Sequence, residues 1–386
     1  MDTKHILANY LKTTRNKMDF LESIKTPTML INKTIAENNI HSMVEKAKFN
    51  NLRFRPHFKT HQSAEIGEWY RAAGVHSITV SSVTMAHYFA DAGWQDILIA
   101  FPVNLLEIKE IVSLSQRVKL GLLIDSGVVV QKLEKELISP VEFWIKIDTG
   151  YHRAGLYWEN VEEILSLAEK IKTSAKMKLK GLLTHAGHVY HAKSSLEVLD
   201  IFNQTRLRMS NVKTAVEESL GIPIEISVGD TPGCTLGEDF TGINEIRPGN
   251  FIFYDIQQYC LGVCSLSDIA VMLACPVISV YPERNEILIY GGAIHLSKDY
   301  ALDPNGNNIY GLVRLPDEEI SEKIKKRYVR SISQEHGIVS MPGKDLESLS
   351  PGNLVYVYPT HSCLTLQAMQ DIYLFDGKRI STMLSK

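Results

Sequence analysis

The stretch SITVSSVTMAHYFADAGWQDILIAFP (77–102) contains the repeating unit that decides the fold. Two short apolar runs, SITVSS (77–82) and DILIAFP (96–102), flank VTMAHYFADAG (83–93), which has the spacing of an amphipathic helix. The apolar runs are nearly continuous, which is typical of parallel strands buried on both faces. The stretch therefore predicts a strand–helix–strand unit of an α/β protein.

The same alternation extends over residues 27–255. The further strand candidates are TPTMLIN (27–33), RFRPHFK (53–59), KLGLLID (119–125), EFWIKID (142–148), KLKGLLTHAG (178–187), EISVGD (225–230) and IRPGNFIFYD (246–255). Eight or nine such units over about 230 residues favour a (β/α)8 TIM-type barrel over two open sheets. The Gly-rich phosphate motifs GxGxxG and GxxxxGKS/T, with which open sheets begin, do not occur.

The pattern changes after about residue 262. Runs such as AVMLACPVISVYP, EILIYGG, LVYVYPTHS and IYLFDGKRI are separated by turn signals such as Pro351-Gly352 and Asp376-Gly377. We therefore expect three parts: an N-terminal segment (1–25), a barrel (26–262) and a C-terminal all-β domain (263–386). The first 25 residues either cover the barrel or pack with the β domain.

Composition excludes several classes of protein. Of the 386 residues, 45% are hydrophobic and 22% charged, and the net charge of −3 gives no basic excess for nucleic acid or an anionic membrane. The N-terminus lacks the apolar run of an export signal. The five scattered cysteines suit reduced thiols. These features predict a cytoplasmic protein with no nucleic-acid or membrane partner.

Polar residues gather where the expected barrel strands end, which is where barrel enzymes place their reactive groups. Lys59 ends an apolar strand between His57 and His61. A lysine buried there would have a lowered pKa, and its neutral amine would form a Schiff base. The alternative is a surface lysine at the start of a loop; the flanking histidines and Pro56 favour a functional one.

Two small motifs follow the last expected barrel strands. Gly229-Asp230-Thr231 and Gly249-Asn250 lie where this fold binds phosphate through loop N–H groups. Alone, each is equally well explained as a tight turn. Together with Lys59 they indicate a phosphorylated aldehyde cofactor.

His361 and Cys363 are two residues apart on an expected strand end, so a period of two places both side chains on one face. An imidazole and a thiolate suit zinc or a similar metal. The alternative is a buried cysteine beside a loop histidine.

Six motifs resemble those of a known family: RPHFKTH, KIDTGYHRAG, LLTHAGH, SVGDTPG, EIRPGNFIFYD and PTHSC, spanning residues 55–363. The chain resembles the fold-type III pyridoxal-phosphate (PLP) enzymes with an alanine-racemase-like barrel, in the branch of D-threonine aldolase and D-serine dehydratase. The resemblance implies PLP, a divalent metal (zinc or manganese) near it, and a homodimer.

The resemblance also implies roles for individual residues. Lys59 matches the lysine that carries PLP, His185 the histidine that stacks on its ring, and Arg153 the arginine near its phenolic oxygen. Arg247 lies where racemases place an arginine facing the pyridine nitrogen. The matches to the phosphate loops are Gly229, Thr231, Gly249 and Asn250, and those to the metal ligands are His361 and Cys363.

The expected activity is that of a PLP- and metal-dependent lyase on β-hydroxy D-amino acids. The D preference comes from the resemblance. We expect retro-aldol cleavage to glycine and an aldehyde, with dehydration to a 2-oxo acid and ammonia as the alternative. The candidate bases are Lys59, His188 and His191. A base near the β-hydroxyl favours cleavage, whereas one restricted to Cα favours dehydration. His188 and His191 are equally well explained as loop histidines bonded to backbone.

Three other functions are less favoured. An amino-acid racemase of this family would need a tyrosine where this chain has His361-Ser362-Cys363. A silent PLP carrier would consist of the barrel alone. A metal-dependent barrel hydrolase would need an HxH ligand pair on its first strand, and TPTMLIN supplies none.

Overall fold

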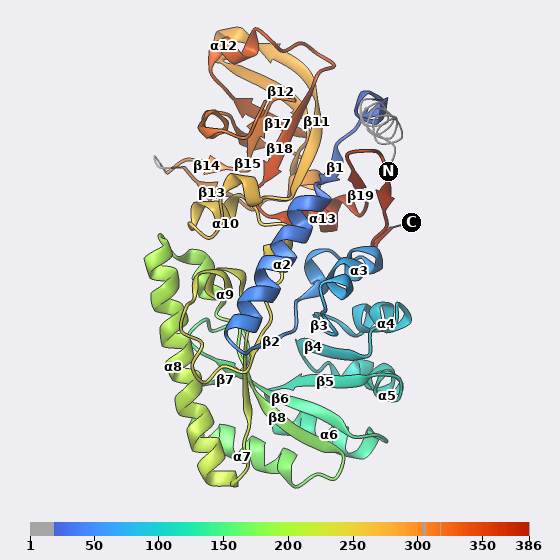
Figure 1. The fold of residues 1–386 in the computed structure, drawn as a ribbon, viewed down its shortest axis with the longest axis vertical. Coiled ribbons are helices and arrows are strands. Elements are labelled where there is room, and N and C mark those ends of the chain that lie inside the picture. Colours follow the sequence, from blue (N-terminus) through green and yellow to red (C-terminus); the bar gives the residue numbers. More distant parts are fainter. Residues whose placement is uncertain (1–18, 304–305, 317, 386) are drawn as a thin grey trace, which may run out of the picture. The chain divides into compact units, whose positions relative to one another are not determined.

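The computed structural model describes residues 19–303, 306–316 and 318–385. The chain divides into two compact units. The barrel unit is Ile40–Phe251, and the sheet unit joins residues 19–39 to residues 252–385. Figure 1 shows both units, each with a sheet of its own.

The barrel unit is a parallel sheet of eight strands in the order β2-β10-β9-β8-β6-β5-β4-β3. A parallel bridge between His57 and Thr79 joins the two ends of this order, so the sheet closes on itself. The helices α3 to α8 lie outside the strands (Figure 1). The predicted (β/α)8 barrel followed by a β domain is therefore confirmed.

The bounds of the barrel-unit elements follow the chain. The strands are β2 (Arg53–Phe54), β3 (Ser77–Val80), β4 (Asp96–Pro102), β5 (Lys119–Ile124), β6 (Val141–Asp148), β7 (Leu156–Tyr157, beside β6), β8 (Met177–Leu183), β9 (Glu225–Val228) and β10 (Glu245–Ile246). The helices are α3 (Ala64–Ala72), α4 (Val83–Asp91), α5 (Ile108–Ser115), α6 (Gly127–Glu136), α7 (Val161–Lys172), α8 (Ser195–Leu220) and α9 (Thr231–Leu236). The 3-10 turns are η1 (Phe58–Thr60), η2 (Leu105–Glu107), η3 (Gly187–His191) and η4 (Asn250–Ile252).

The apolar side chains of the strands form the barrel core. Leu98, Leu123, Trp144 and Leu183 come from four different strands, make one cluster and are each 1% exposed. Gly181 permits two strands to approach closely, because a Cβ there would lie 2.0 Å from the Glu225 carbonyl oxygen. Buried strands with this packing hold the strand ends, and hence the site, in fixed positions.

One predicted barrel strand belongs elsewhere. β1 (Thr28–Ile31) pairs antiparallel with β11 (Val271–Tyr281) and parallel with β19 (Ile372–Leu374), so it lies in the sheet unit. The expectation of a first barrel strand at 27–33 was therefore wrong. Local hydrophobicity marks a buried strand but not its partners, which here lie more than 200 residues away.

The sheet unit contains a nine-stranded sheet in the order β12-β17-β16-β15-β18-β11-β1-β19-β20, in which β12 also pairs with β11, and a two-stranded sheet of β13 and β14. That pairing closes six antiparallel strands into a ring. The remaining strands are β12 (Glu286–Tyr290), β13 (Ala301–Leu302), β14 (Asn308–Ile309), β15 (Gly311–Arg314), β16 (Tyr328–Ile332), β17 (His336–Ser340), β18 (Leu354–Pro359) and β20 (Arg379–Ile380). The helices are α10 (Ile256–Cys260), α11 (Ala293–Leu296), α12 (Gly343–Leu346) and α13 (Ser362–Met369), with turns η5 (Leu266–Asp268), η6 (Pro282–Arg284) and η7 (Glu322–Lys326). Helix α2 (Lys33–Phe49) crosses the division between the units.

Most of the predicted N-terminal segment, residues 1–18, lies outside the described residues. In the part that is described, the ring of Phe20 stacks on that of Tyr373, with the centroids 5.6 Å apart. Among the described helices, none is both long enough and apolar enough to span a membrane.

Candidate active site

The predicted cofactor residues follow the carboxyl ends of five barrel strands. Lys59 follows β2, Arg153 follows β6 and His185 follows β8. The residues after β9 and β10 are Gly229, Thr231, Arg247, Gly249 and Asn250. Because the strands are parallel, these ends meet at one end of the barrel, and the structure brings the predicted set together there.

Lys59 lies in the turn η1 between Phe58 and Thr60, which are both fully buried. The Lys59 side chain itself is exposed, so the expectation of a buried lysine was wrong. Its backbone N–H donates to His57 Nδ1 at 3.4 Å. The proline at position 56 cannot donate to a sheet, and β2 ends at Phe54. The turn therefore presents Lys59 at the barrel mouth instead of continuing the strand.

His57 and His185 are neutral imidazoles beside Lys59. Burial, followed by the positive charge of Lys59, lowers the pKa of both well below the ordinary value. His185 Nδ1 hydrogen-bonds the carbonyl oxygen of Gly229, so this nitrogen carries the proton. A neutral, oriented imidazole fits the expected role of His185 against a cofactor ring.

Arg247 is 4% exposed, and hydrogen bonds to Ser227 and Thr184 fix its guanidinium group. Its Nε donates to Ser227 Oγ at 2.7 Å and its Nη2 to the Thr184 carbonyl oxygen at 2.5 Å. Ser227 Oγ in turn donates to Glu245 Oε1 at 2.7 Å. Burial lowers the pKa of Arg247 to about 10, which leaves it cationic at neutral pH.

The expected phosphate loops have the features that a bound anion requires. A Cβ on Gly249 would lie 2.9 Å from Thr60 Oγ1, and one on Gly229 would lie 3.0 Å from Arg247 Cβ, so neither position has room for a side chain. The buried hydroxyl of Thr231 has no hydrogen-bond partner among the described residues. A buried hydroxyl is normally paired, so this one is available to a ligand. The residues present fit PLP.

Lys146 is a buried cation that the sequence reasoning passed over. It is 5% exposed on β6, and burial followed by the charges of Arg247 and Arg153 lowers its pKa to about 7. The signal was present in KIDTG, because a lysine two residues before Asp148 on an apolar strand points to the same face.

The two candidate histidine bases differ in environment. His188 is half-buried, and its Nδ1 is buried with no hydrogen-bond partner among the described residues. Its ring lies 6.2 Å from that of Tyr151, and the Arg153 guanidinium lies 5.1 Å above the same Tyr151 ring. Burial, followed by the charge of Arg208, lowers the pKa of His188. His191 is exposed, so the structure places His188 rather than His191 among the other candidate groups.

The expected metal ligands lie in the sheet unit. β18 ends at Pro359, and His361 caps the N-terminus of α13, so the expectation of a strand end at His361 and Cys363 was wrong. The two side chains nevertheless hydrogen-bond each other. His361 Nδ1 also lies 2.6 Å from Asp299 Oδ2. Burial lowers the pKa of His361, but these hydrogen bonds outweigh it and raise the pKa to about 10.

The donor set of His361 and Cys363 fits a borderline divalent metal such as zinc. Within the described residues there is no group of three or more histidine, cysteine, aspartate or glutamate side chains that could hold a metal ion. A metal held here would have two protein ligands, with the other positions left for small molecules.

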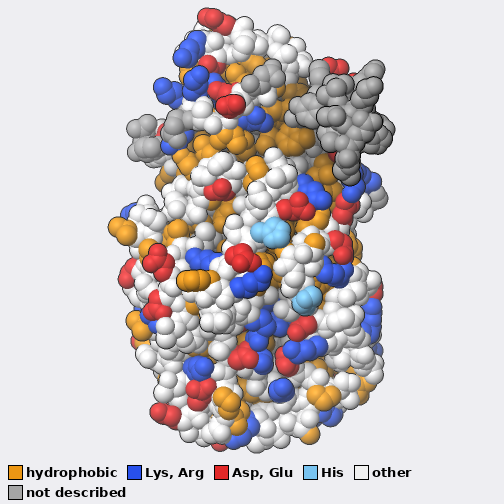
Figure 2. Space-filling view, in the orientation of Figure 1, with side chains coloured by type: hydrophobic (Ala, Val, Ile, Leu, Met, Phe, Trp, Pro, Cys, Tyr) orange, Lys and Arg blue, Asp and Glu red, His pale blue; other side chains and the backbone are white. Residues whose placement is uncertain are grey.

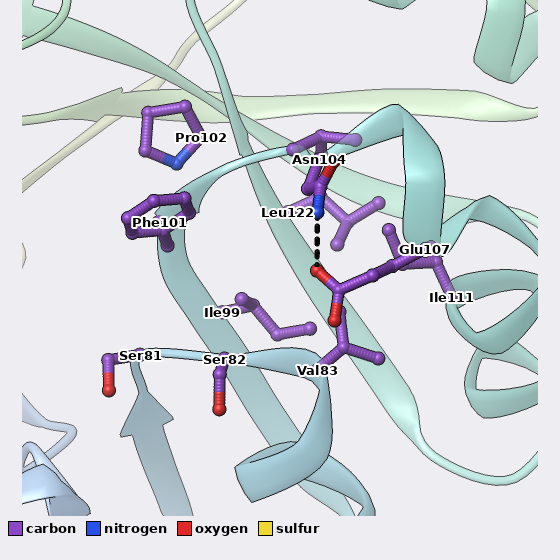
Figure 3. A pocket seen from close by; sticks show the side chains of 11 residues that line it. Ser81, Ser82, Val83, Ile99, Phe101, Pro102, Asn104, Glu107, Ile111 and Leu122 are labelled. Carbon is purple, nitrogen blue, oxygen red and sulfur yellow. Dashed lines mark hydrogen bonds between the residues drawn. The ribbon is translucent and has the colours of Figure 1, made fainter.

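A separate cavity of about 160 Å³ lies among the loops that follow β3 and β4 (Figure 3). Its walls are mainly apolar, and Asn104 Nδ2 donates to Glu107 Oε2 at 3.0 Å on one side. None of the predicted site residues lines it.

Comparison with known families and proteins agrees with this geometry. The family described as "Alanine racemase, N-terminal domain" matches residues 31–256, more than half of the chain, and "Putative serine dehydratase domain" matches residues 270–375. A D-serine dehydratase of Dictyostelium discoideum is 28% identical, over 93% of this chain and 95% of its own. A D-threonine aldolase of Arthrobacter sp is 23% identical, over 61% of this chain and 63% of its own.

Solved structures extend the comparison. The structure of D-threo-3-hydroxyaspartate dehydratase from Delftia sp. HT23 has a TM-score of 0.86 and 26% identity, over 94% of this chain and 99% of its own. Structures of a D-threo-3-hydroxyaspartate dehydratase include a cysteine-to-alanine mutant in the metal-free form and a histidine-to-alanine mutant, at positions two residues apart. The chain belongs to the family built on an alanine racemase N-terminal domain, the fold-type III PLP enzymes, and is a PLP-dependent lyase.

Proposed function

We propose that the chain removes water from β-hydroxy D-amino acids and yields a 2-oxo acid and ammonia, with D-serine as the simplest substrate. The observation that carries this proposal is the extent of the matches: the dehydratase match covers 93% of this chain, including the sheet unit, and the D-threonine aldolase match covers 61%. The sequence motifs alone favour retro-aldol cleavage, with dehydration as the alternative, and the difference in the extent of the matches favours dehydration. The atoms balance. The substrate loses its Cα proton and its β-hydroxyl as one water, which leaves an enamine. The imine tautomer of that enamine then adds one water and releases ammonia, which gives the 2-oxo acid.

The barrel unit contains suitable groups for the Cα step. PLP, when bound, supplies the electron sink for the bond broken at Cα. Lys59 is the residue that we assign to carrying the cofactor and to moving the Cα proton, because its exposed amine lies beside the neutral His57 and His185. Arg247, fixed by Ser227 and Thr184, supplies a positive charge at the end of the barrel where these residues meet.

For the hydroxyl step we propose that His361 and Cys363 bind a divalent metal, zinc or manganese. The contact between their side chains supports this assignment. So does the spacing of the two mutated residues in the related dehydratase, whose cysteine-to-alanine mutant has a structure in the metal-free form. A bound metal acts as a Lewis acid toward a hydroxyl oxygen, which makes hydroxide a better leaving group.

Retro-aldol cleavage is the second candidate, and His188 is the observation that favours it. His188 is half-buried, its pKa is lowered, and its buried Nδ1 has no hydrogen-bond partner among the described residues, so it can accept a hydroxyl proton. The D-threonine aldolase match, although shorter, also supports it.

The test is incubation of the PLP-loaded protein with D-serine, with and without EDTA. The proposal predicts pyruvate and ammonia that disappear when EDTA removes the metal and return on addition of Zn²⁺ or Mn²⁺. Glycine and formaldehyde as the main products would instead support the aldolase. D-Alanine has no β-hydroxyl, and we expect no efficient racemisation of it. The homodimer and the cytoplasmic location stay predictions.

A further inference from the structure

The segment that carries Asp299 is hydrogen-bonded to helix α13, which His361 precedes as its N-cap. Helix α11 precedes this segment, and Thr365 Oγ1 on α13 donates to the Leu296 carbonyl oxygen at 3.3 Å. Ser297 then has a φ of +72°, which a non-glycine residue rarely adopts and which marks a position held by its surroundings. The Asp299 N–H donates to Ser297 Oγ at 3.2 Å. The backbone thus turns sharply and directs residue 299 to α13.

The backbone on the other side of this contact is also fixed. Thr360 Oγ1 donates to the Ile309 carbonyl oxygen at 2.9 Å. Ser362, between the two expected metal ligands, donates from its backbone N–H and from Oγ to Asp255 Oδ2, at 3.0 and 3.2 Å. Asp255 is fully buried. His361 therefore lies on a backbone that is held on both sides.

The hydrogen bond between Asp299 and His361 selects one ring nitrogen. A carboxylate oxygen can only accept, so His361 Nδ1, 2.6 Å from Asp299 Oδ2, must be the donor. Nε2 is then the nitrogen left for a metal. Histidines that bind metals commonly donate their other N–H to a carboxylate, which fixes the orientation of the ring and makes it a better ligand.

We propose that Asp299 is a positioning residue for the metal site: its carboxylate holds His361 so that Nε2, together with Cys363 Sγ, binds a divalent metal. This inference rests on the proposed metal site and adds a residue to it. Asp299 acts through His361 and is not itself assigned as a ligand.

The test is the affinity of the full-length, PLP-loaded protein for Zn²⁺ alone, measured by competition with a chromogenic chelator. Asp299→Ala is expected to weaken binding by about 10- to 100-fold, the usual effect of losing such a partner. Asp299→Asn is expected to weaken it by a smaller factor, because the amide oxygen still accepts from Nδ1 but carries no charge. The matched control is Asp371→Ala, which removes a carboxylate of the same unit that pairs with Arg379. It is expected to keep the wild-type affinity.

The outcomes separate the two claims. If the wild type binds no Zn²⁺, the proposed metal site is wrong and the inference falls with it. If the wild type binds Zn²⁺ and a folded Asp299→Ala protein binds it equally tightly, the metal site stands and the role of Asp299 is wrong. Thermal unfolding and the visible absorbance of bound PLP report whether each variant is folded. If Asp299→Ala does not fold, the test rests on Asp299→Asn. Wild-type affinity of Asp299→Asn for Zn²⁺ would then overturn the inference.

Discussion

Arg247 Nε donates a hydrogen bond to Ser227 Oγ across 2.7 Å, and both residues are buried. The Ser227 hydroxyl in turn donates to the Glu245 carboxylate, which also accepts a hydrogen bond from Arg55 Nε at 2.8 Å. Arg247, which the resemblance places opposite the cofactor ring, is thus connected to an ion-pair network in the barrel interior.

Replacing Ser227 with alanine should destabilise the barrel unit. The change leaves the buried Arg247 Nε without its acceptor and removes a donor from Glu245. Hydrogen bonds to charged groups contribute about 1.5–3 kcal/mol, so we expect a loss of that size in the free energy of unfolding. Urea unfolding measures it. Ser113→Ala, at an exposed position on α5, is the control and should change stability by less than about 0.5 kcal/mol. Equal stability of the two variants would contradict the network.

Glu245 should make stability depend on acid pH. Burial raises the pKa of this carboxyl, but Arg55 and Arg53 outweigh burial and lower the pKa from 4.5 to about 2. A lowered carboxyl pKa stabilises the folded state fully above about pH 4.5, and this contribution is lost as the pH falls to about 2. The shift corresponds to roughly 3 kcal/mol.

The measurement is the unfolding free energy of wild type and Glu245→Gln as the pH falls. We expect the variant to be less stable at pH 7, and the difference to shrink progressively below about pH 4.5. Glu68→Gln breaks only an exposed pair with Arg71 and should differ from wild type by about 0–1 kcal/mol at every pH. A difference for Glu245→Gln that does not change with pH would contradict the assignment.

Lys59 should be the lysine that carries PLP. Borohydride reduction followed by peptide mapping is expected to place the phosphopyridoxyl group on Lys59. Lys146 is the informative rival, because its amine has a pKa of about 7 and is therefore partly neutral, but it is 5% exposed. Lys59→Ala should abolish the label and Lys146→Met should retain it. A label on Lys146 in the wild type would show that burial, not position after β2, selects the lysine.

Cys363 should be required for metal and not for PLP. Cys363→Ala is expected to lose the bound divalent metal and dehydratase activity while keeping the visible absorbance of bound PLP, because the cofactor residues lie in the barrel unit. Elemental analysis and absorbance spectra measure both. Cys260→Ala removes an exposed thiol of the same unit and serves as the control. Full activity in metal-free Cys363→Ala would rule out the metal.

Strand ends were predictable, because periodicity and composition locate buried parallel strands and the fold then brings their ends together. Lys59 was located in this way, whereas the roles of His185 and Arg247 come from the family resemblance. Two kinds of feature were not predictable. β1 has the same apolar pattern as a barrel strand, and only its partners β11 and β19 assign it to the other sheet.

The second kind concerns side chains whose environment depends on distant residues. Lys59 is exposed because a short turn follows β2, although its sequence neighbours are buried. Asp299 lies 62 residues before His361, in a segment without a recognisable motif, so the sequence does not indicate their contact. The contact between His361 and Cys363 was expected for the wrong reason, since a helix begins there rather than a strand ending.

The most direct test of dehydration uses D-threonine, because both candidate reactions act on it and give different products. Proton NMR of the reaction of PLP- and Zn²⁺-loaded protein follows both product sets in one sample. Elimination predicts 2-oxobutyrate with one ammonia for each substrate consumed, and neither glycine nor acetaldehyde in comparable amount. Glycine and acetaldehyde as the main products would contradict the proposed dehydratase and restore retro-aldol cleavage.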